Sequence, residues 1–130
     1  MEDLHIPASN ETPEISFEFS SHSLSMHGES YPENAMSFYG PIRSSLQNYL
    51  EKLPADGRVN VNIGLRYFNS SSTKLIRALI GMLDKTASNG PTIAVDWLHD
   101  EEDDMMLEFG MDLKEEHRSL QFNTVVVEPA

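Results

Sequence analysis

A run of short hydrogen-bonding side chains stands near the middle of the chain and consists of Asn69, Ser70, Ser71, Ser72 and Thr73. An alternating apolar–polar segment precedes this run, and apolar residues at helical spacing follow it from Lys74 onward. The run is therefore predicted to be a turn that joins a strand to a helix. Unpaired N–H groups and the helix dipole favour a negative group at such a position. Its hydroxyls are candidates for phosphorylation, which adds about −1.5 to −2 charges at pH 7.

Helix capping is the simpler explanation of the same residues, because Asn, Ser and Thr are common N-caps that contribute about 1 kcal/mol. One cap needs only one such residue, so the length of the run exceeds what capping requires. A serine hydrolase is a third interpretation, but the Gly-x-Ser-x-Gly motif of those enzymes does not occur in the chain. The residues alone leave capping and a regulatory phosphosite as the interpretations to be compared.

Other polar residues do not predict catalysis, a metal site or a cofactor. The five histidines, at positions 5, 22, 27, 99 and 117, lack the spacing of metal ligands. The acidic run Asp100–Asp104 lacks the Gly and the terminal Glu of a calcium-binding EF-hand loop. It is better explained as the start of a helix, where carboxylates suit the dipole. We therefore expect a protein that is not an enzyme and holds neither metal nor cofactor.

The bulk composition indicates one domain, residues 1–130, with a core large enough to fold alone. The formal net charge of −12 argues against nucleic acid or an anionic membrane as the main partner. Cysteine is absent, which excludes disulfides and thiolate chemistry. The N-terminus does not resemble a signal peptide, and no apolar run approaches the roughly 20 residues that span a bilayer. We expect a cytoplasmic protein without membrane insertion.

The order of elements predicted from periodicity is β-β-α-β-α-β-α-β. The strands are expected at 14–20, 24–28, 58–68, 92–98 and 122–127, and the helices at 34–53, at 72–88 and from 100–104 onward. The first two strands are predicted to form an antiparallel hairpin, and residues 1–13 an extended lead-in. Asn34 is the expected cap of the first helix, and Gly40-Pro41 is expected to kink it.

The alternation in strand 58–68 predicts how the sheet is covered. Its odd-numbered positions from Val59 to Tyr67 are apolar and its even-numbered positions are mainly polar. Helices should therefore cover mainly one face of a mostly parallel sheet, unlike a Rossmann-type sandwich. Loops that leave parallel strands for helices share one edge of the sheet. We thus expect Tyr31–Asn34, Asn69–Thr73 and His99–Asp104 along one rim, where a phosphate on the turn would face the acidic run.

The strand, the Asn69-Ser70-Ser71-Ser72 turn and the helix together resemble the STAS domains of anti-sigma-factor antagonists. The usual turn there is Asp-Ser-Ser-Gly, with its first Ser as the phosphoacceptor; here Asn replaces the acid and Ser replaces the Gly.

The chain is more closely similar to the SiaC family of bacterial regulatory phosphoproteins. The resemblance is carried by 3–7 (DLHIP), 24–26 (LSM), 28–34 (GESYPEN) and 67–74 (YFNSSSTK). It spans nearly the whole chain, and the Tyr-Pro-Glu-Asn string is its most specific part.

This resemblance implies a STAS-like fold and a switch function. The unphosphorylated form would bind and activate a diguanylate cyclase, raising cyclic-di-GMP and promoting aggregation and biofilm. A Ser/Thr kinase of the anti-sigma type would phosphorylate the protein, and a PP2C-like phosphatase would reset it. The implied phosphoacceptor is Ser70, where the family often has Thr.

The expected site comprises the phosphoacceptor, its turn and a partner-binding rim. The neighbouring hydroxyls Ser71, Ser72 and Thr73 are alternative acceptors, and Asn69 and Lys74 complete the turn; the rim consists of Tyr31, Pro32, Glu33 and Asn34. Two other functions remain alternatives: an anti-sigma-factor antagonist that controls transcription, and a domain that binds a small ligand at the rim.

Overall fold

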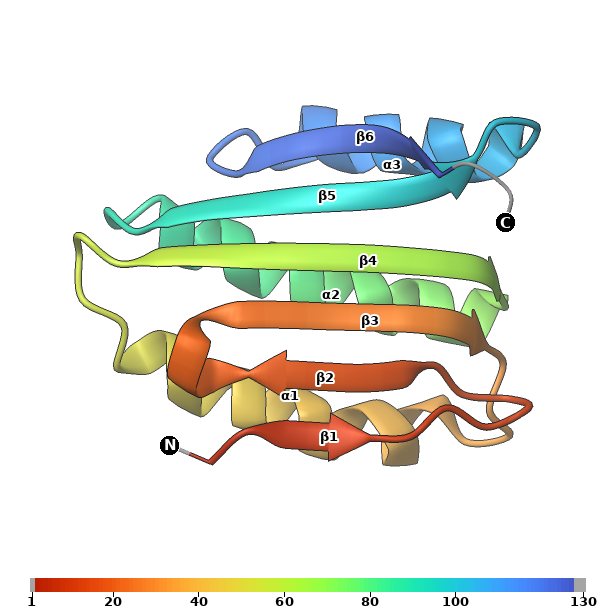
Figure 1. The fold of residues 1–130 in the computed structure, drawn as a ribbon, viewed down its shortest axis with the longest axis horizontal. Coiled ribbons are helices and arrows are strands. Elements are labelled where there is room, and N and C mark those ends of the chain that lie inside the picture. Colours follow the sequence, from red (N-terminus) through yellow and green to blue (C-terminus); the bar gives the residue numbers. More distant parts are fainter. Residues whose placement is uncertain (1, 128–130) are drawn as a thin grey trace.

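Six strands form one sheet in the order in which they occur along the chain (Figure 1). The computed structural model describes residues 2–127. The strands are β1 (Leu4–Ile6), β2 (Glu14–Glu18), β3 (Ser23–Ser30), β4 (Arg58–Phe68), β5 (Thr92–Asp100) and β6 (Gln121–Val127), and the helices are α1 (Ala35–Glu51), α2 (Ser70–Ala87) and α3 (Asp104–Glu116). β1 to β3 pair antiparallel, whereas β3 to β6 pair parallel. The predicted hairpin and mostly parallel sheet are confirmed.

All three helices lie against the same face of the sheet (Figure 1). In β4 the side chains of Val59, Val61 and Ile63 are buried, while those of Asn60 and Asn62 on the other face are exposed. A half-polar strand can be stable only where one face meets water, so the alternation itself excludes a second helical layer over β4. The predicted cover of one face is confirmed.

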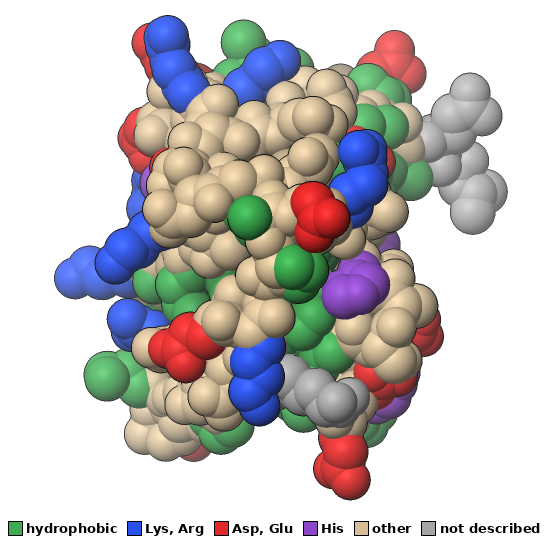
Figure 2. All heavy atoms as spheres, turned by 90° about the vertical axis from the view of Figure 1, so that its left-hand side faces the viewer, with side chains coloured by type: hydrophobic (Ala, Val, Ile, Leu, Met, Phe, Trp, Pro, Cys, Tyr) green, Lys and Arg blue, Asp and Glu red, His purple; other side chains and the backbone are tan. Residues whose placement is uncertain are grey.

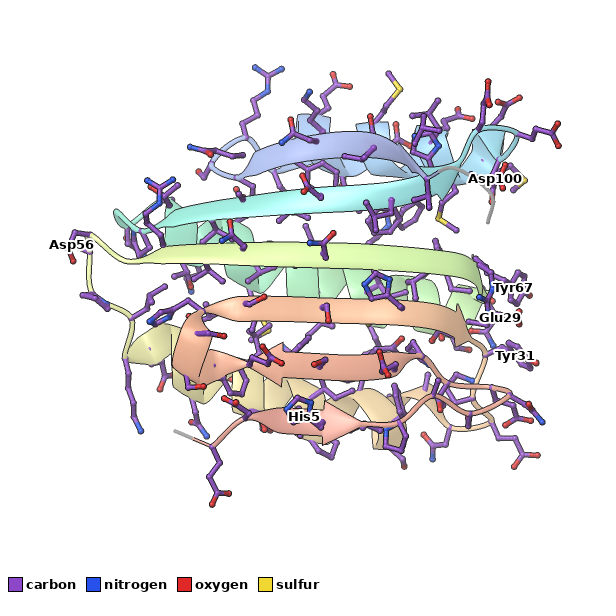
Figure 3. The ribbon with its side chains drawn as sticks, in the orientation of Figure 1. His5, Glu29, Tyr31, Asp56, Tyr67 and Asp100 are labelled. Atoms are coloured by element: carbon purple, nitrogen blue, oxygen red, sulfur yellow. The ribbon has the colours of Figure 1, made fainter. Side chains whose placement is uncertain are left out.

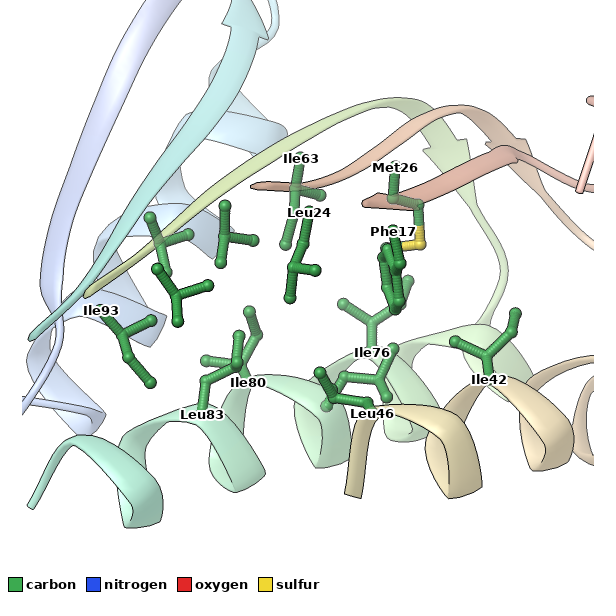
Figure 4. Packing of buried hydrophobic residues seen from close by; sticks show 14 of the residues in the cluster. Phe17, Leu24, Met26, Ile42, Leu46, Ile63, Ile76, Ile80, Leu83 and Ile93 are labelled. Carbon is green, nitrogen blue, oxygen red and sulfur yellow. The ribbon is translucent and has the colours of Figure 1, made fainter. Parts of the chain in front are cut away.

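The main core lies between this face and the first two helices (Figure 4). The helices contribute buried side chains at helical spacing, and the strands contribute every second residue. Prominent members are Ile42 and Leu46 of α1, Ile76, Ile80 and Leu83 of α2, and Phe17, Leu24, Met26, Ile63 and Ile93 of the sheet. This packing fixes α1 and α2 beside each other beneath the strands that precede them.

The lead-in expected at 1–13 contains an edge strand, which is a correction. β1 pairs antiparallel with β2, with Leu4 opposite Phe17 and Ile6 opposite Ile15. Only three residues take part, followed at once by Pro7. Such a segment has too few residues to show a period, because its strand conformation depends on the neighbour that it pairs with.

A β-bulge changes the facing of residues at the end of β4. Gly28 pairs with Leu65, but Glu29 pairs with Tyr67, so Arg66 is an extra residue on β4. One extra residue moves the following side chains to the opposite face. Tyr67, predicted to share the apolar face, is consequently 52% exposed at the edge. Gly28 has φ of 128°, a backbone conformation that favours glycine, and β3 continues through it to Ser30 instead of ending there.

The helix starts follow their asparagine caps. α1 begins at Ala35 after Asn34, as predicted, and runs on through Gly40 and Pro41. The helix is thus continuous across Gly40 and Pro41, while the kink expected at this point stays a prediction. α2 begins at Ser70 and not near Ser72, because the Asn69 side chain supplies the cap and lets the hydroxyl residues enter the first turn.

Candidate functional site

Asn69 holds the turn between β4 and α2 through hydrogen bonds of its side chain and its backbone. Its Oδ1 accepts from the Ser72 N–H at 2.9 Å, which makes it the N-cap of α2. Its carbonyl oxygen accepts from the Thr73 hydroxyl at 3.0 Å, and its own N–H donates to the Ser30 carbonyl at 3.0 Å. The turn is thereby tied both to its own helix and to the end of the neighbouring strand β3.

The four hydroxyl residues after Asn69 differ in accessibility. Ser70 and Ser71 are exposed, whereas Thr73 is half-buried and hydrogen-bonded to the backbone. Ser72 is fully buried, with 0% of its surface exposed. A kinase could reach the first two hydroxyls in this conformation but not that of Ser72. Burial thus separates side chains that look equivalent in the sequence.

Ser72 belongs to a buried network of hydroxyl groups that joins three elements. The Ser30 hydroxyl at the end of β3 donates to Ser72 Oγ at 2.8 Å and lies 2.6 Å from Tyr39 Oη of α1. Burial raises the pKa of Tyr39, and its hydrogen bonds to the two serines oppose this shift. No local pattern in the sequence predicts this network, because its members Ser30, Tyr39 and Ser72 are far apart in the chain.

The predicted rim lies directly beside the turn. Tyr31 packs edge-on against Tyr67 with ring centroids 5.8 Å apart, and both are at the carboxyl edge of the parallel strands (Figure 3). Pro32 is buried, whereas Glu33 and Asn34 are exposed. Asn34 Oδ1 accepts from the Ser37 N–H at 3.1 Å and so caps α1. Asn34 and Asn69 thus cap two neighbouring helices at one edge.

A surface hollow of about 580 Å³ lies between these two helix starts, and we call it the Ser70 hollow. It is lined by Glu33, Asn34, Ala35, Met36, Ser70, Ser71, Lys74 and Leu75. The sequence predicted the polar members but not Ala35, Met36 or Leu75, whose apolar side chains carry no motif.

The electrostatics of the Ser70 hollow suit an anion. The N–H groups of Ala35, Met36, Ser70 and Ser71 have no acceptor among residues 2–127. Two helix N-termini bring their partial positive charges here, and Lys74 adds a full one. A phosphate on Ser70 would meet these groups, with Glu33 as the opposing charge.

The acidic run is at the same edge of the sheet but does not line the Ser70 hollow. Asp100 is at the end of β5, on the same side as Tyr31 and Tyr67 (Figure 3). Asp103 Oδ1 accepts from the Met106 N–H at 3.0 Å, which confirms the acidic start of α3. The run borders a separate hollow with His27 and Arg66. The common rim is confirmed, but the expected facing of a phosphate and this run is not supported by the lining residues.

Residues 2–127 contain no group of three His, Asp or Glu side chains able to hold a metal ion. In the same part of the chain, none of the helices is long and apolar enough to cross a membrane. The Ser70 hollow instead combines two exposed hydroxyl groups, the Lys74 side chain and N–H groups of the first helical turns that have no acceptor among residues 2–127.

Comparison with known proteins agrees with the resemblance noted in the sequence. Residues 6–127 match the model of the SiaC family regulatory phosphoproteins. An uncharacterised protein of Pseudomonas aeruginosa (strain UCBPP-PA14) is 30% identical over 118 residues, which cover 89% of this chain and 90% of that protein.

Solved structures lead to the same family. SiaC of Pseudomonas aeruginosa is 26% identical, with a TM-score of 0.83 and coverage of 98% of both chains. A second similar structure shows the diguanylate cyclase SiaD in complex with its activator SiaC from that organism. It gives a TM-score of 0.83 at 26% identity and covers 95% of this chain and 98% of that one. Sequence and fold together show that the chain belongs to the SiaC family of regulatory phosphoproteins.

Proposed function

We propose that this chain is a non-catalytic switch that binds and activates a diguanylate cyclase when it is unphosphorylated. The proposal is supported by family membership and by likeness to a SiaC that is bound to its cyclase as an activator. Activation would raise cyclic-di-GMP and promote aggregation and biofilm. The switch would act in the cytoplasm as one regulatory domain, without a cofactor.

We assign the phosphoacceptor to Ser70, and the observation that carries this assignment is its position in the Ser70 hollow. Ser70 is exposed at the first position of α2, and Lys74 follows one helical turn later on the same hollow. Ser71 remains the alternative, while the burial of Ser72 argues against its hydroxyl. A kinase of the anti-sigma type would add the phosphate and a PP2C-like phosphatase would remove it.

Phosphorylation would act mainly by changing the charge of this surface. A phosphate at a helix N-terminus is stabilised by the free N–H groups, so the fold need not change. A cyclase surface that fits the neutral hollow would instead meet a bulky dianion. Hundredfold control requires about 3 kcal/mol, which a charge forced against an apolar or acidic surface can supply.

Modification is tested with the purified chain, its partner kinase and ATP, followed by intact-mass measurement and mapping of the site. We expect one phosphate on Ser70, and none on Ser70→Ala. Ser71→Ala is the matched control, since it removes the adjacent exposed hydroxyl and should still accept a phosphate. Phosphate on Ser70→Ala together with its loss from Ser71→Ala would move the assignment to Ser71.

Binding is tested by titrating the cyclase encoded in the same genome with variants at position 70. Ser70→Asp should weaken binding about tenfold or more because it places a carboxylate in the hollow, whereas Ser70→Ala should bind like the wild type. Capture of a sigma-factor inhibitor in place of a cyclase would contradict the proposal and favour an anti-sigma-factor antagonist.

A further inference from the structure

The two edge strands of the sheet differ in how well they are protected from pairing with another strand. β1 has only three residues and is followed at once by Pro7. β6 at the other edge has seven residues, and none of them is charged or a proline. Edge strands are usually short, charged or interrupted by proline, because their outer N–H and C=O groups can pair with another chain. β6 has none of these protections.

β6 also exposes apolar side chains. It pairs with β5 on one side, and none of residues 2–127 pairs with its outer side. Val125, Val126 and Val127 are 37%, 51% and 44% exposed, respectively. A row of exposed β-branched residues on an unpaired strand is typical of a strand that another strand covers.

The flank of α3 beside β6 continues this surface. α3 packs against β5 and β6, and its other flank faces α2. On that flank Glu116 forms an ion pair with Arg77 of α2 at 3.0 Å, and the Arg77 guanidinium lies over the Phe109 ring at 4.6 Å from its centroid. Helical geometry turns positions 104, 107, 111 and 114 away from α2, to the side of the sheet edge.

These four positions form a stripe with opposite charges at its ends and apolar residues in its middle. We call it the α3 stripe, and its members are Asp104, Leu107, Met111 and Lys114. Met111 is 56% exposed, and neither charged residue forms an ion pair with any of residues 2–127. The spacing is symmetrical, so an antiparallel second stripe would place Asp104 beside Lys114 and Leu107 beside Met111. The α3 stripe is therefore complementary to itself under a two-fold rotation.

The strand and the α3 stripe share one centre. The middle residue of β6 is Thr124, which pairs in register with Trp97 of β5. Trp97 packs on Phe109 and Gly110, which lie in the middle of the α3 stripe. One two-fold axis at this level, perpendicular to the sheet, can therefore pair β6 antiparallel with a second β6 and set two α3 stripes side by side. The helices of both copies would then cover the same face of one continuous sheet.

The charges around β6 favour the same antiparallel arrangement. The acidic run Asp100–Asp104 is at the carboxyl edge, where Figure 3 labels Asp100. Lys114 and Arg118 are exposed near the opposite edge, shortly before β6 begins. Figure 2, which views that amino edge, shows basic side chains along the upper border of the molecule, where α3 and β6 lie. Antiparallel copies bring these unlike ends together, whereas parallel copies would bring like charges together.

We propose that β6 and the α3 stripe form the interface of a two-fold symmetric homodimer, in which β6 pairs antiparallel with β6 of a second copy. Main-chain hydrogen bonds between the strands would supply affinity, and the apolar residues of the two α3 stripes would cover them from the helical side. None of the residues that line the Ser70 hollow belongs to β6 or α3. The inference therefore goes beyond the proposed function and does not depend on it.

The first test measures molar mass by analytical ultracentrifugation from low to high micromolar concentration. Salt at about 0.15 M limits the repulsion from the net charge of −12 to a range of about 8 Å. The wild type should approach twice the mass of one chain, whereas Met111→Asp should remain a single chain because two carboxylates would meet in the apolar middle. Met105→Asp is the matched control, since Met105 is 83% exposed on the same helix but outside the α3 stripe.

Met105→Asp should dimerise like the wild type, and both variants should match its circular dichroism and melting temperature. A wild-type chain that stays single at every concentration would overturn the proposal. Dimerisation that Met111→Asp leaves intact would also overturn it.

The second test reverses the charges of the α3 stripe. Asp104→Lys and Lys114→Asp should each weaken self-association about tenfold or more, because each places like charges together at both ends of the interface. The two variants should nevertheless associate with each other when mixed in equal amounts, since the mixed pair has unlike charges at each end. Misfolding of either variant cannot produce this recovery. Folded variants that stay apart on mixing would contradict the α3 stripe as the interface.

The third test follows the backbone of β6 by amide hydrogen exchange of the wild-type chain at low and high concentration. The amides of β6 should exchange more slowly at high concentration, because some of them gain a partner in the second strand. The amides of β1 are the control and should exchange equally at both concentrations. Protection that increases in β1 or α1 and not in β6 would place the second copy elsewhere and overturn the proposal.

Discussion

Asn69 determines the local structure of the turn between β4 and α2. Its oxygen caps α2 by accepting from Ser72, and its backbone joins the turn to Ser30 of β3. Because the cap is complete without a hydroxyl group, Ser70 and Ser71 are free to face solvent. Capping and phosphorylation are therefore compatible: one residue caps the helix, and another is left to accept a phosphate.

At this scale we expect Asn69→Ala to lower the free energy of unfolding by about 1 kcal/mol, the usual contribution of an N-cap. The variant loses the acceptor of the Ser72 N–H group, which would be left without its partner. Urea unfolding measures the change. Asn69→Asp is the control, because Asp is an equally good cap and its charge suits the dipole, so its stability should stay near that of the wild type. A fully stable alanine variant would show that the cap is dispensable.

Among the elements, α3 depends on close contact with β5. The Trp97 ring is fully buried, stacks on Phe109 at 5.5 Å, and donates a hydrogen bond from Nε1 to the Met106 carbonyl at 3.0 Å. Gly110 allows this approach, since a Cβ there would lie 2.4 Å from Trp97 Cδ1. The contact of Trp97 with Phe109, Met106 and Gly110 is therefore one of those that fix the position of α3.

Two helical glycines therefore give opposite predictions for substitution by alanine. Gly110→Ala should lower the free energy of unfolding by about 1–3 kcal/mol, because the core must shift to admit a methyl group. Gly81→Ala in α2 should raise it by about 0.5–1 kcal/mol, since alanine favours helix and the nearest side-chain atom to a Cβ there is His117 Cε1 at 3.9 Å, an ordinary contact distance. Chemical denaturation of both variants measures the difference, and equal effects would contradict this account of the α3 contact.

At the scale of the whole molecule, the three helices on one face of the sheet determine where the loops of the candidate site lie. Three parallel crossovers place every strand-to-helix loop at one edge, so the turn at Asn69 and the rim at Tyr31 come together there. The helices extend from that edge across one side of the sheet (Figure 1). Ser70, the proposed phosphoacceptor, is thus at the edge where α1 and α2 begin, and a charge added there would face a partner bound at the Ser70 hollow.

The stability of the whole chain should fall in alkaline solution because of two tyrosines of α1. Burial raises the pKa of Tyr49 to about 12, and it also raises that of Tyr39. An unfolded tyrosine has a pKa of about 10, so above this pH the unfolded chain loses protons that the native chain retains. The free energy of unfolding is then lost progressively as pH rises from about 10 toward 12.

Unfolding free energies at pH 9, 10 and 11 measure this slope. Tyr49→Phe should be less stable at pH 9, because it loses the hydrogen bond to His22, but its stability should decline less steeply with pH. Tyr67→Phe is the control, since the Tyr67 side chain is 52% exposed, and its slope should match that of the wild type. An unchanged slope in Tyr49→Phe would contradict the role assigned to burial.

The sequence alone determined the main strands, the three helices, the cap at Asn34 and the one-sided sheet. These follow from periodicity and capping, which act over a few residues and can be seen along the chain. It also placed Tyr31–Asn34 beside the serine turn, because parallel crossovers leave few topologies. The family followed from short strings such as Tyr-Pro-Glu-Asn.

Only the tertiary structure decided which side chains of the site are accessible. The burial of Ser72 depends on Ser30 and Tyr39, and the outward position of Tyr67 depends on the bulge opposite Gly28 and Glu29. The strand β1 and the Ser70 hollow likewise arise from contacts between segments far apart in the chain. Such contacts leave no local period. The five similar residues therefore have different roles in the structure: one cap, two exposed serines, one buried serine and one half-buried threonine.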